Sequence, residues 1–124
     1  SRPRIQAVPA EAPDVLALRA WEAVRTDDSL GDLDKALAIS RIFRDYAEAA
    51  LSFPASSGTS TQILHRLDSL SHLEQGSLPR AKRLLGATDR IKYAGEGATD
   101  ELFEDLDSDL RAFVASTRPR EWTG

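Results

Sequence analysis

The sequence predicts an all-α fold, a single compact bundle of about five helices. In five segments the apolar residues recur at spacings of three and four, which places them on one side of a helix. The links between these segments are short and carry glycine, proline or serine, and no stretch alternates as a strand would. A chain of 124 residues with 41% hydrophobic residues suffices for one domain with its own core.

The chain divides into three parts: a linker over 1–13, a helical bundle domain over 14–117 and a tail over 118–124. Three prolines among small and polar residues favour an extended linker. Asp14 is then predicted to cap the first helix, which continues for about twelve residues with Trp21 on its apolar stripe.

The second helix is predicted over about 33–51 and is expected to be central. Its apolar arc is wide because two neighbouring faces, one of them with Ile39 and Phe43, are both apolar. Such a helix packs against neighbours on two sides. Pro54 and the small polar loop over 55–58 end it.

A third helix is predicted to begin at Thr59, because Gln62 follows at the spacing of a capping box. It is expected to run to about Ser71, with leucines and an isoleucine facing inward.

The last two helices have recognisable ends. Ser77 is predicted to cap the fourth helix, with Pro79 in its first turn, and Gly95 is predicted to end it in the left-handed conformation. Thr99 is predicted to cap the fifth helix, which runs to about Thr117.

Composition excludes several classes of protein. The net charge of −4 argues against a nucleic-acid-binding domain, which usually has a basic footprint. The absence of cysteine excludes a disulfide scaffold, a thiolate metal site and a cysteine nucleophile. No apolar run reaches the ~18–20 residues that a membrane span needs, so the chain as written is predicted to be soluble.

One triplet has metal-ligand spacing. His65, Asp68 and His72 lie about one helical turn apart and could gather a metal ion. The helical wheel places them opposite the apolar stripe of the third helix, and no fourth ligand accompanies them. We therefore interpret them as a solvated polar face and predict no metal site and no cofactor.

No catalytic residues are predicted, and the chain is not expected to be an enzyme. General acid–base catalysis needs two carboxyl groups in different environments within one pocket. The carboxylates of the fifth helix instead point away from its apolar stripe or flank it. They favour a solvated face paired with the basic fourth helix, or, as the alternative, an acidic docking surface. Nucleophile-elbow and phosphate-loop patterns are missing from the sequence. The carboxylates are Asp100, Glu101, Glu104, Asp105, Asp107 and Asp109.

Three charged residues point toward the expected core. Arg44 falls within the second apolar arc of its helix, Lys92 lies near the apolar face of the fourth helix, and Asp89 precedes it by one turn. We predict that Arg44 and Lys92 converge on Asp89 at a contact between helices. This polar cluster is interpreted as a pin that fixes helix register, with a docking site as the alternative.

Four stretches occur in the order of one known family. They are residues 42–48 (IFRDYAE), 59–64 (TSTQIL), 89–94 (DRIKYA) and 113–117 (FVAST). The chain resembles the cytoplasmic C-terminal helical domain of the Bat-type aerotolerance membrane proteins. There the stretches read roughly Arg-Arg-Tyr-Leu-Glu, Thr-Thr-x-Glu-Phe-Leu, Asp-Leu-Val-Lys-Phe-Ala and Phe-Val-x-x-Thr. The chain departs from the pattern where Phe43 replaces the first arginine, Ala47 the leucine and Gln62 the glutamate, which concerns any shared surface more than the fold.

The resemblance implies a larger parent protein, with extracytoplasmic β-sandwich domains, a membrane span and this helical domain at the cytoplasmic face of the bacterial inner membrane. The linker would then be juxtamembrane, and Arg2 and Arg4 fit the positive-inside bias. Genes of this family accompany those of MoxR-type AAA+ ATPases and von Willebrand A domain proteins. The resemblance therefore implies one of these as a protein partner and a role in envelope stress or aerotolerance.

The leading functional prediction is a non-enzymatic protein-interaction domain. The alternative is a free-standing regulatory module that binds a small ligand between its helices, which a pocket with convergent polar groups would favour. A third reading, nucleic-acid binding through the basic fourth helix, is disfavoured by net charge. Trp122 in the tail either docks on the domain or is exposed.

Overall fold

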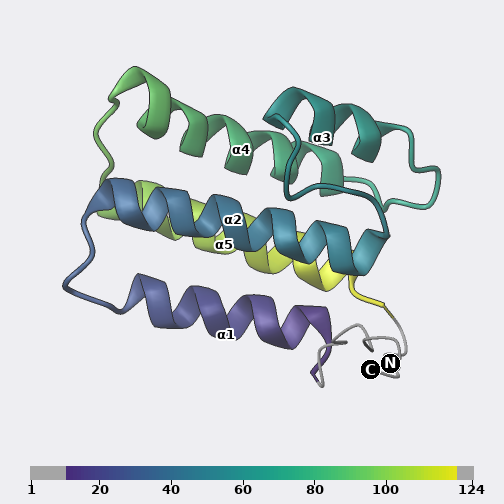
Figure 1. The fold of residues 1–124 in the computed structure, drawn as a ribbon, viewed down its shortest axis with the longest axis horizontal. Coiled ribbons are helices and arrows are strands. Elements are labelled where there is room, and N and C mark those ends of the chain that lie inside the picture. The colour runs from purple at the N-terminus through teal and green to yellow at the C-terminus, as the bar shows by residue number, and fades with distance from the viewer. Residues whose placement is uncertain (1–10, 120–124) are drawn as a thin grey trace, which may run out of the picture.

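The computed structural model describes residues 11–119, and it confirms the all-α prediction (Figure 1). Within these residues there are five helices and no strand. The helices are α1 (Pro13–Arg25), α2 (Asp32–Leu51), α3 (Ser60–Asp68), α4 (Ser77–Ala94) and α5 (Asp100–Thr117). Residues 1–10 of the predicted linker, and 120–124 of the tail with Trp122, lie outside the described part.

Helix α2 occupies the centre of the bundle, as its wide apolar arc predicts (Figure 1). It contacts α1 on one side, α4 on the other and α5 behind it. Helices α4 and α5 pack against each other, and Arg83 Nη2 lies 2.8 Å from Asp109 Oδ1 across that contact. The acidic fifth helix thus pairs with the basic fourth helix. Among the described helices, the short α3 packs against α4 alone.

The core is built around aromatic contacts between α2 and α5. The ring of Phe113 lies 4.9 Å from that of Phe43 and 6.3 Å from that of Tyr46, measured between centroids. Phe43 and Phe113 are fully buried, and Tyr46 is 2% exposed. The hydroxyl of Tyr46 donates a hydrogen bond to the carbonyl of Val114 at 3.2 Å. Burial of these rings is the main apolar contribution that holds α5 to α2.

Three helix ends agree with the sequence. Thr59 Oγ1 accepts a bond from the Gln62 backbone N–H at 3.1 Å, and Gln62 Oε1 accepts one from the Thr59 N–H at 2.9 Å, so the capping box is complete. Thr99 Oγ1 accepts from the Leu102 N–H at 3.1 Å. Gly95 ends α4 with φ of 64°, a left-handed conformation that glycine adopts without steric cost.

Two predicted caps are wrong. Helix α1 begins at Pro13 with Ala12 as its N-cap, because proline lacks the N–H that the first turn leaves unpaired. Asp14 therefore lies inside the first turn. Helix α4 follows Gly76, whose φ of 95° makes the turn, and the buried Ser77 bonds Ser116 Oγ on α5 at 2.8 Å instead of capping.

The third helix is shorter than predicted and ends at Asp68. Among the described residues, no helix is long and apolar enough to cross a membrane.

We expect Phe113→Ala to destabilise the domain by about 3–5 kcal/mol, because it removes the ring that both Phe43 and Tyr46 contact. Urea unfolding followed by circular dichroism measures this loss. Phe103→Ala on the same helix is the matched control, since Phe103 is only partly buried. An equal loss in the two variants would contradict the central role of Phe113.

Stability is expected to fall at high pH through Tyr46, because burial raises its pKa to about 12. The unfolded tyrosine loses its proton near pH 10, as the free side chain does, while the folded one keeps it. The stability that depends on protonated Tyr46 is therefore fully present below pH 10. It is lost as the pH rises from 10 through 12, where the free energy of unfolding falls by up to about 1.4 kcal/mol per pH unit. Urea unfolding at a series of alkaline pH values should give a shallower slope for Tyr46→Phe. Identical slopes would refute the assignment.

Candidate functional site

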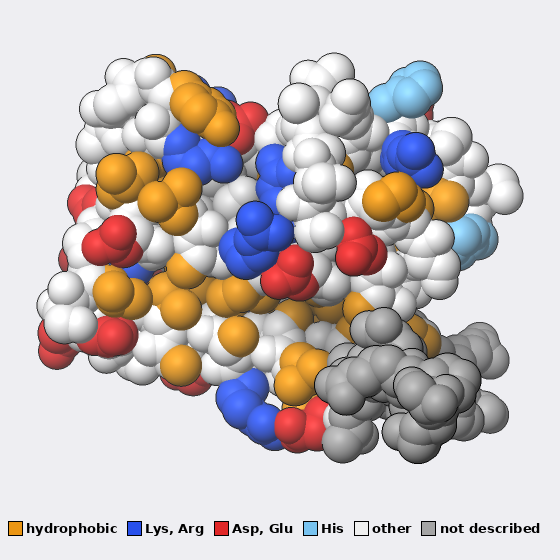
Figure 2. Space-filling model, viewed as in Figure 1, with side chains coloured by type: hydrophobic (Ala, Val, Ile, Leu, Met, Phe, Trp, Pro, Cys, Tyr) orange, Lys and Arg blue, Asp and Glu red, His pale blue; other side chains and the backbone are white. Residues whose placement is uncertain are grey.

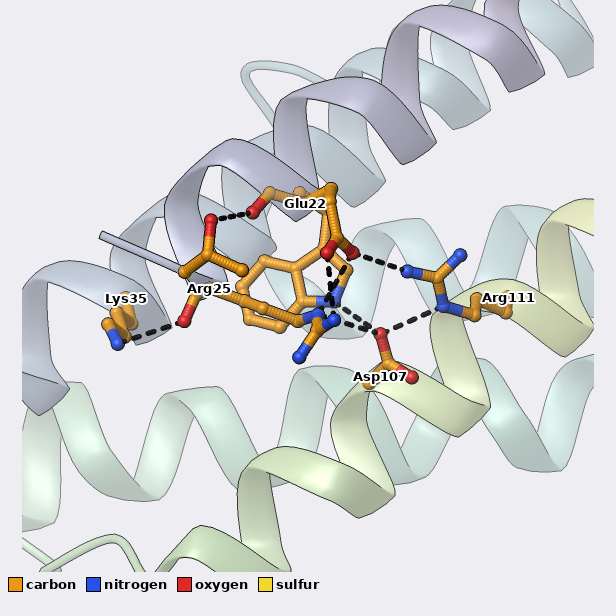
Figure 3. Close-up of polar contacts among 7 residues, drawn as sticks. Glu22, Arg25, Lys35, Asp107 and Arg111 are labelled. Atoms are coloured by element: carbon orange, nitrogen blue, oxygen red, sulfur yellow. Dashed lines mark hydrogen bonds and ion pairs between the residues drawn. The ribbon is translucent and has the colours of Figure 1, made fainter. Parts of the chain in front are cut away.

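Two polar clusters join the helices, and the first links α1 to α5 (Figure 3). The indole Nε1 of the fully buried Trp21 donates to Asp107 Oδ1 at 2.9 Å. Arg111 Nε donates to the same oxygen at 2.9 Å, and Arg111 Nη2 donates to Glu22 Oε1 at 3.0 Å. Arg25 Nη2 completes the network on Glu22 Oε2 at 2.8 Å. Each charged group already has a partner, so this cluster holds α1 in place rather than awaiting a ligand.

Sequence reasoning missed this network. The signal was present, because Asp107 flanks the apolar stripe of its helix and Trp21 occupies the stripe of another. A carboxylate at such an edge can accept the bond that a buried indole N–H requires. Only the packing of α1 near α5 shows that the two residues meet.

The second cluster is an open cleft between α2, the start of α3 and the end of α4, with a volume of about 560 Å³. Its lining comes from α2, from the loop over 56–59 with the first turn of α3, and from the last turns of α4. The lining residues are Leu37, Ser40, Arg41, Arg44, Ser56, Ser57, Gly58, Thr59, Ser60, Thr61, Asp89, Lys92 and Tyr93.

The structure brings all three predicted cluster residues to this cleft but does not join them as one group. Lys92 Nζ lies 3.6 Å from Asp89 Oδ1, one helical turn away. Among the described residues, no ion pair links Arg44 to Asp89. The guanidinium of Arg44 instead donates to Ser40 Oγ at 3.3 Å, to the carbonyl of Gly58 and to Ser60 Oγ at 3.3 Å.

Arg44 therefore holds the loop that follows α2, and Glu48 holds the same loop one turn later. Glu48 Oε1 accepts bonds from the backbone N–H of Ser56 at 3.1 Å, from its hydroxyl at 2.9 Å and from the N–H of Ala55 at 3.0 Å. These bonds lower the pKa of Glu48 below its usual value. Together the two charged side chains give the cleft a defined end.

Lys92 is a partly buried cation in the lining of the cleft. Its side chain is only 13% exposed, yet within residues 11–119 its ammonium has no hydrogen bond. Its neighbours are Asp89 at 3.6 Å and the ring of Tyr93, whose centroid lies 5.3 Å away. The ammonium has three N–H donors, so it can donate further hydrogen bonds to anionic or carbonyl oxygens of a ligand.

The rim of the cleft is apolar and exposed. Tyr93 on α4 is 82% exposed and Leu37 on α2 is 46% exposed, and both line the cleft. Leu33, one turn before Leu37 on α2, is 50% exposed. The site thus combines cationic side chains within and large apolar side chains at its edge, which suits binding.

The three residues with metal-ligand spacing lie on a solvent-exposed face. His65, Asp68 and His72 are all exposed. Within residues 11–119, no three side chains of the metal-binding types gather closely enough to hold an ion.

Comparisons of the chain with protein-family models, with curated proteins and with solved structures found no match. The resemblance to the Bat-type helical domain therefore stays a prediction.

We expect Arg44→Ala to lower the free energy of unfolding by about 1–3 kcal/mol, since it leaves a loop carbonyl and two hydroxyls without their donor. Asp89→Ala should cost less than about 1 kcal/mol, because Asp89 is 32% exposed and Lys92 faces the open cleft. Urea unfolding of both variants measures the difference. A larger loss for Asp89→Ala would restore the predicted register pin.

Proposed function

We propose that this chain is a non-enzymatic protein-interaction domain that docks its partner at the cleft between α2, α3 and α4. The observation that carries the proposal is the exposure of Leu37 on α2 and Tyr93 on α4, which both line that cleft. A single exposed aromatic needs no explanation, but large apolar side chains around a polar recess are typical of binding surfaces. Tyrosine is also among the residues that contribute most to binding in interfaces.

The arrangement supports binding better than catalysis. The lining offers hydroxyls, three cationic side chains and one carboxylate, the aspartate that pairs with Lys92. A cleft of this kind orients and retains a partner.

The finer proposal rests on the resemblance alone. If the chain is the cytoplasmic part of a Bat-type membrane protein, the domain lies at the inner face of the bacterial inner membrane. Its partner would then be a MoxR-type AAA+ ATPase or a von Willebrand A domain protein, and its role would concern envelope stress or aerotolerance.

One observation favours the alternative, a regulatory module for a small ligand. The cleft volume of about 560 Å³ falls within the range of small-molecule sites. Such sites are mostly lined by apolar side chains, whereas most residues that line this cleft are polar or charged. Thermal unfolding in the presence of a metabolite panel separates the two, because a ligand that binds the folded state raises the melting temperature.

We expect the double variant Leu37→Ala, Tyr93→Ala to lose partner capture at least about tenfold, because it removes both exposed apolar side chains of the lining. Capture is measured by pull-down from the source organism's membrane extract, with the ATPase and the von Willebrand A protein quantified by mass spectrometry.

The matched control is Val15→Ala, Leu16→Ala, which truncates two exposed apolar side chains on α1 that do not line the cleft. Circular dichroism should report a folded protein for both double variants. Equal capture by the two variants, or no capture by the wild type, would refute docking at the cleft.

A further inference from the structure

We propose that the cleft receives an acidic peptide segment of the partner, with its carboxylates on Lys92 and Arg41 and an apolar side chain between Leu37 and Tyr93. The inference rests on the proposed function and adds the chemistry of what is bound. It follows from the charge of the lining, the unfilled donors within it and the apolar rim.

Charge is the first argument. Arg41, Arg44 and Lys92 line the cleft together with the carboxylate of Asp89, and Asp45 lies 3.7 Å from Arg41. Figure 2 views this face and shows basic side chains, with acidic ones beside them, where α2 and α4 lie side by side. Cationic side chains in a lining attract an anionic partner by electrostatic complementarity.

Among the described residues, Lys92 has donors that are free to bind an acidic side chain. Its side chain is 13% exposed, and its nearest carboxylate oxygen is 3.6 Å away, beyond ordinary hydrogen-bond distance. A partly buried ammonium gains most from charge-assisted bonds with carboxylate oxygens. A glutamate or aspartate from a partner would supply them at the open side of the cleft.

Arg41 provides the second cation. Its side chain is 60% exposed, with one N–H on the carbonyl of Ser56 at 3.2 Å and Asp45 at 3.7 Å. The guanidinium has five donors in a planar fork, so enough remain for a carboxylate. Arg44, by contrast, is occupied by the loop and serves to shape the cleft.

The rim decides between an acidic peptide and other anions. Free phosphate would leave the exposed Leu37 and Tyr93 unused. A peptide carrying acidic residues beside a bulky apolar one satisfies both features of the site.

The test is an NMR titration of the isotope-labelled 124-residue chain with a short synthetic peptide that has glutamates on both sides of one leucine. We expect saturable shifts confined to the cleft, at Leu37, Arg41, Lys92 and Tyr93, that weaken as salt is added. The same peptide with lysine in place of glutamate should produce none.

Two substitutions and a control make the test specific. Lys92→Gln and Arg41→Gln should each weaken binding at least about fivefold. Lys82→Gln, the same change at an exposed position of α4 outside the cleft, should leave it unchanged. Because Arg41 is well exposed, its variant stays informative even if Lys92→Gln perturbs the fold.

Several results would overturn the inference: no shifts at millimolar peptide, equal shifts with the lysine peptide, shifts mainly outside the cleft, or tighter binding by inorganic phosphate or a DNA duplex. Its failure is distinguishable from that of the proposed function. If the partner is captured through Leu37 and Tyr93 while the acidic peptide neither binds nor competes, docking stands and the acidic segment is wrong. If capture also fails, both are wrong.

Discussion

The packing of Phe113 against Phe43 and Tyr46 is the contact on which the remaining arrangement depends, since it holds α5 against the central helix α2. Helix α1 rests on α2 and is fastened to α5 by the bond from Trp21 to Asp107. Helix α4 packs on both α2 and α5, and α3 is attached to α4. The cleft lies where α2, the start of α3 and the end of α4 come together, and α4 is held in place by both α2 and α5.

The two polar clusters differ in how completely they are satisfied. Between α1 and α5, the indole of Trp21 and the guanidinium of Arg111 share one carboxylate oxygen, and Glu22 receives two arginines. Such a closed network contributes rigidity and structural specificity. In the cleft, Lys92 retains donors beside an exposed Tyr93. An incompletely paired cation at an open surface is where a ligand gains the most, which is the physical basis of the proposed docking site.

The candidate site was predictable in part. A helical wheel places Lys92, Asp89 and Arg44 at or near the apolar faces of their helices, and all three line the same cleft. The predicted contact of Arg44 with Asp89 does not form, because the guanidinium donates instead to the loop carbonyl of Gly58 and the hydroxyl of Ser60. Periodicity gives the direction of a side chain on its own helix, but it carries no information on the path of a loop. For the same reason the bonds from Ala55 and Ser56 to Glu48 could not be foreseen.

By itself, the sequence determined the all-α class, the five helices, the central place of α2, the capping box at Thr59 and the left-handed end at Gly95. These features depend on local propensity and on apolar spacing within a single segment. Only the tertiary structure decided that Ser77 bonds to α5 rather than caps its helix, that Trp21 meets Asp107, and that Leu37 and Tyr93 line one cleft. Each of these joins residues far apart in the chain, and their meeting follows from how the helices pack, which no single segment encodes.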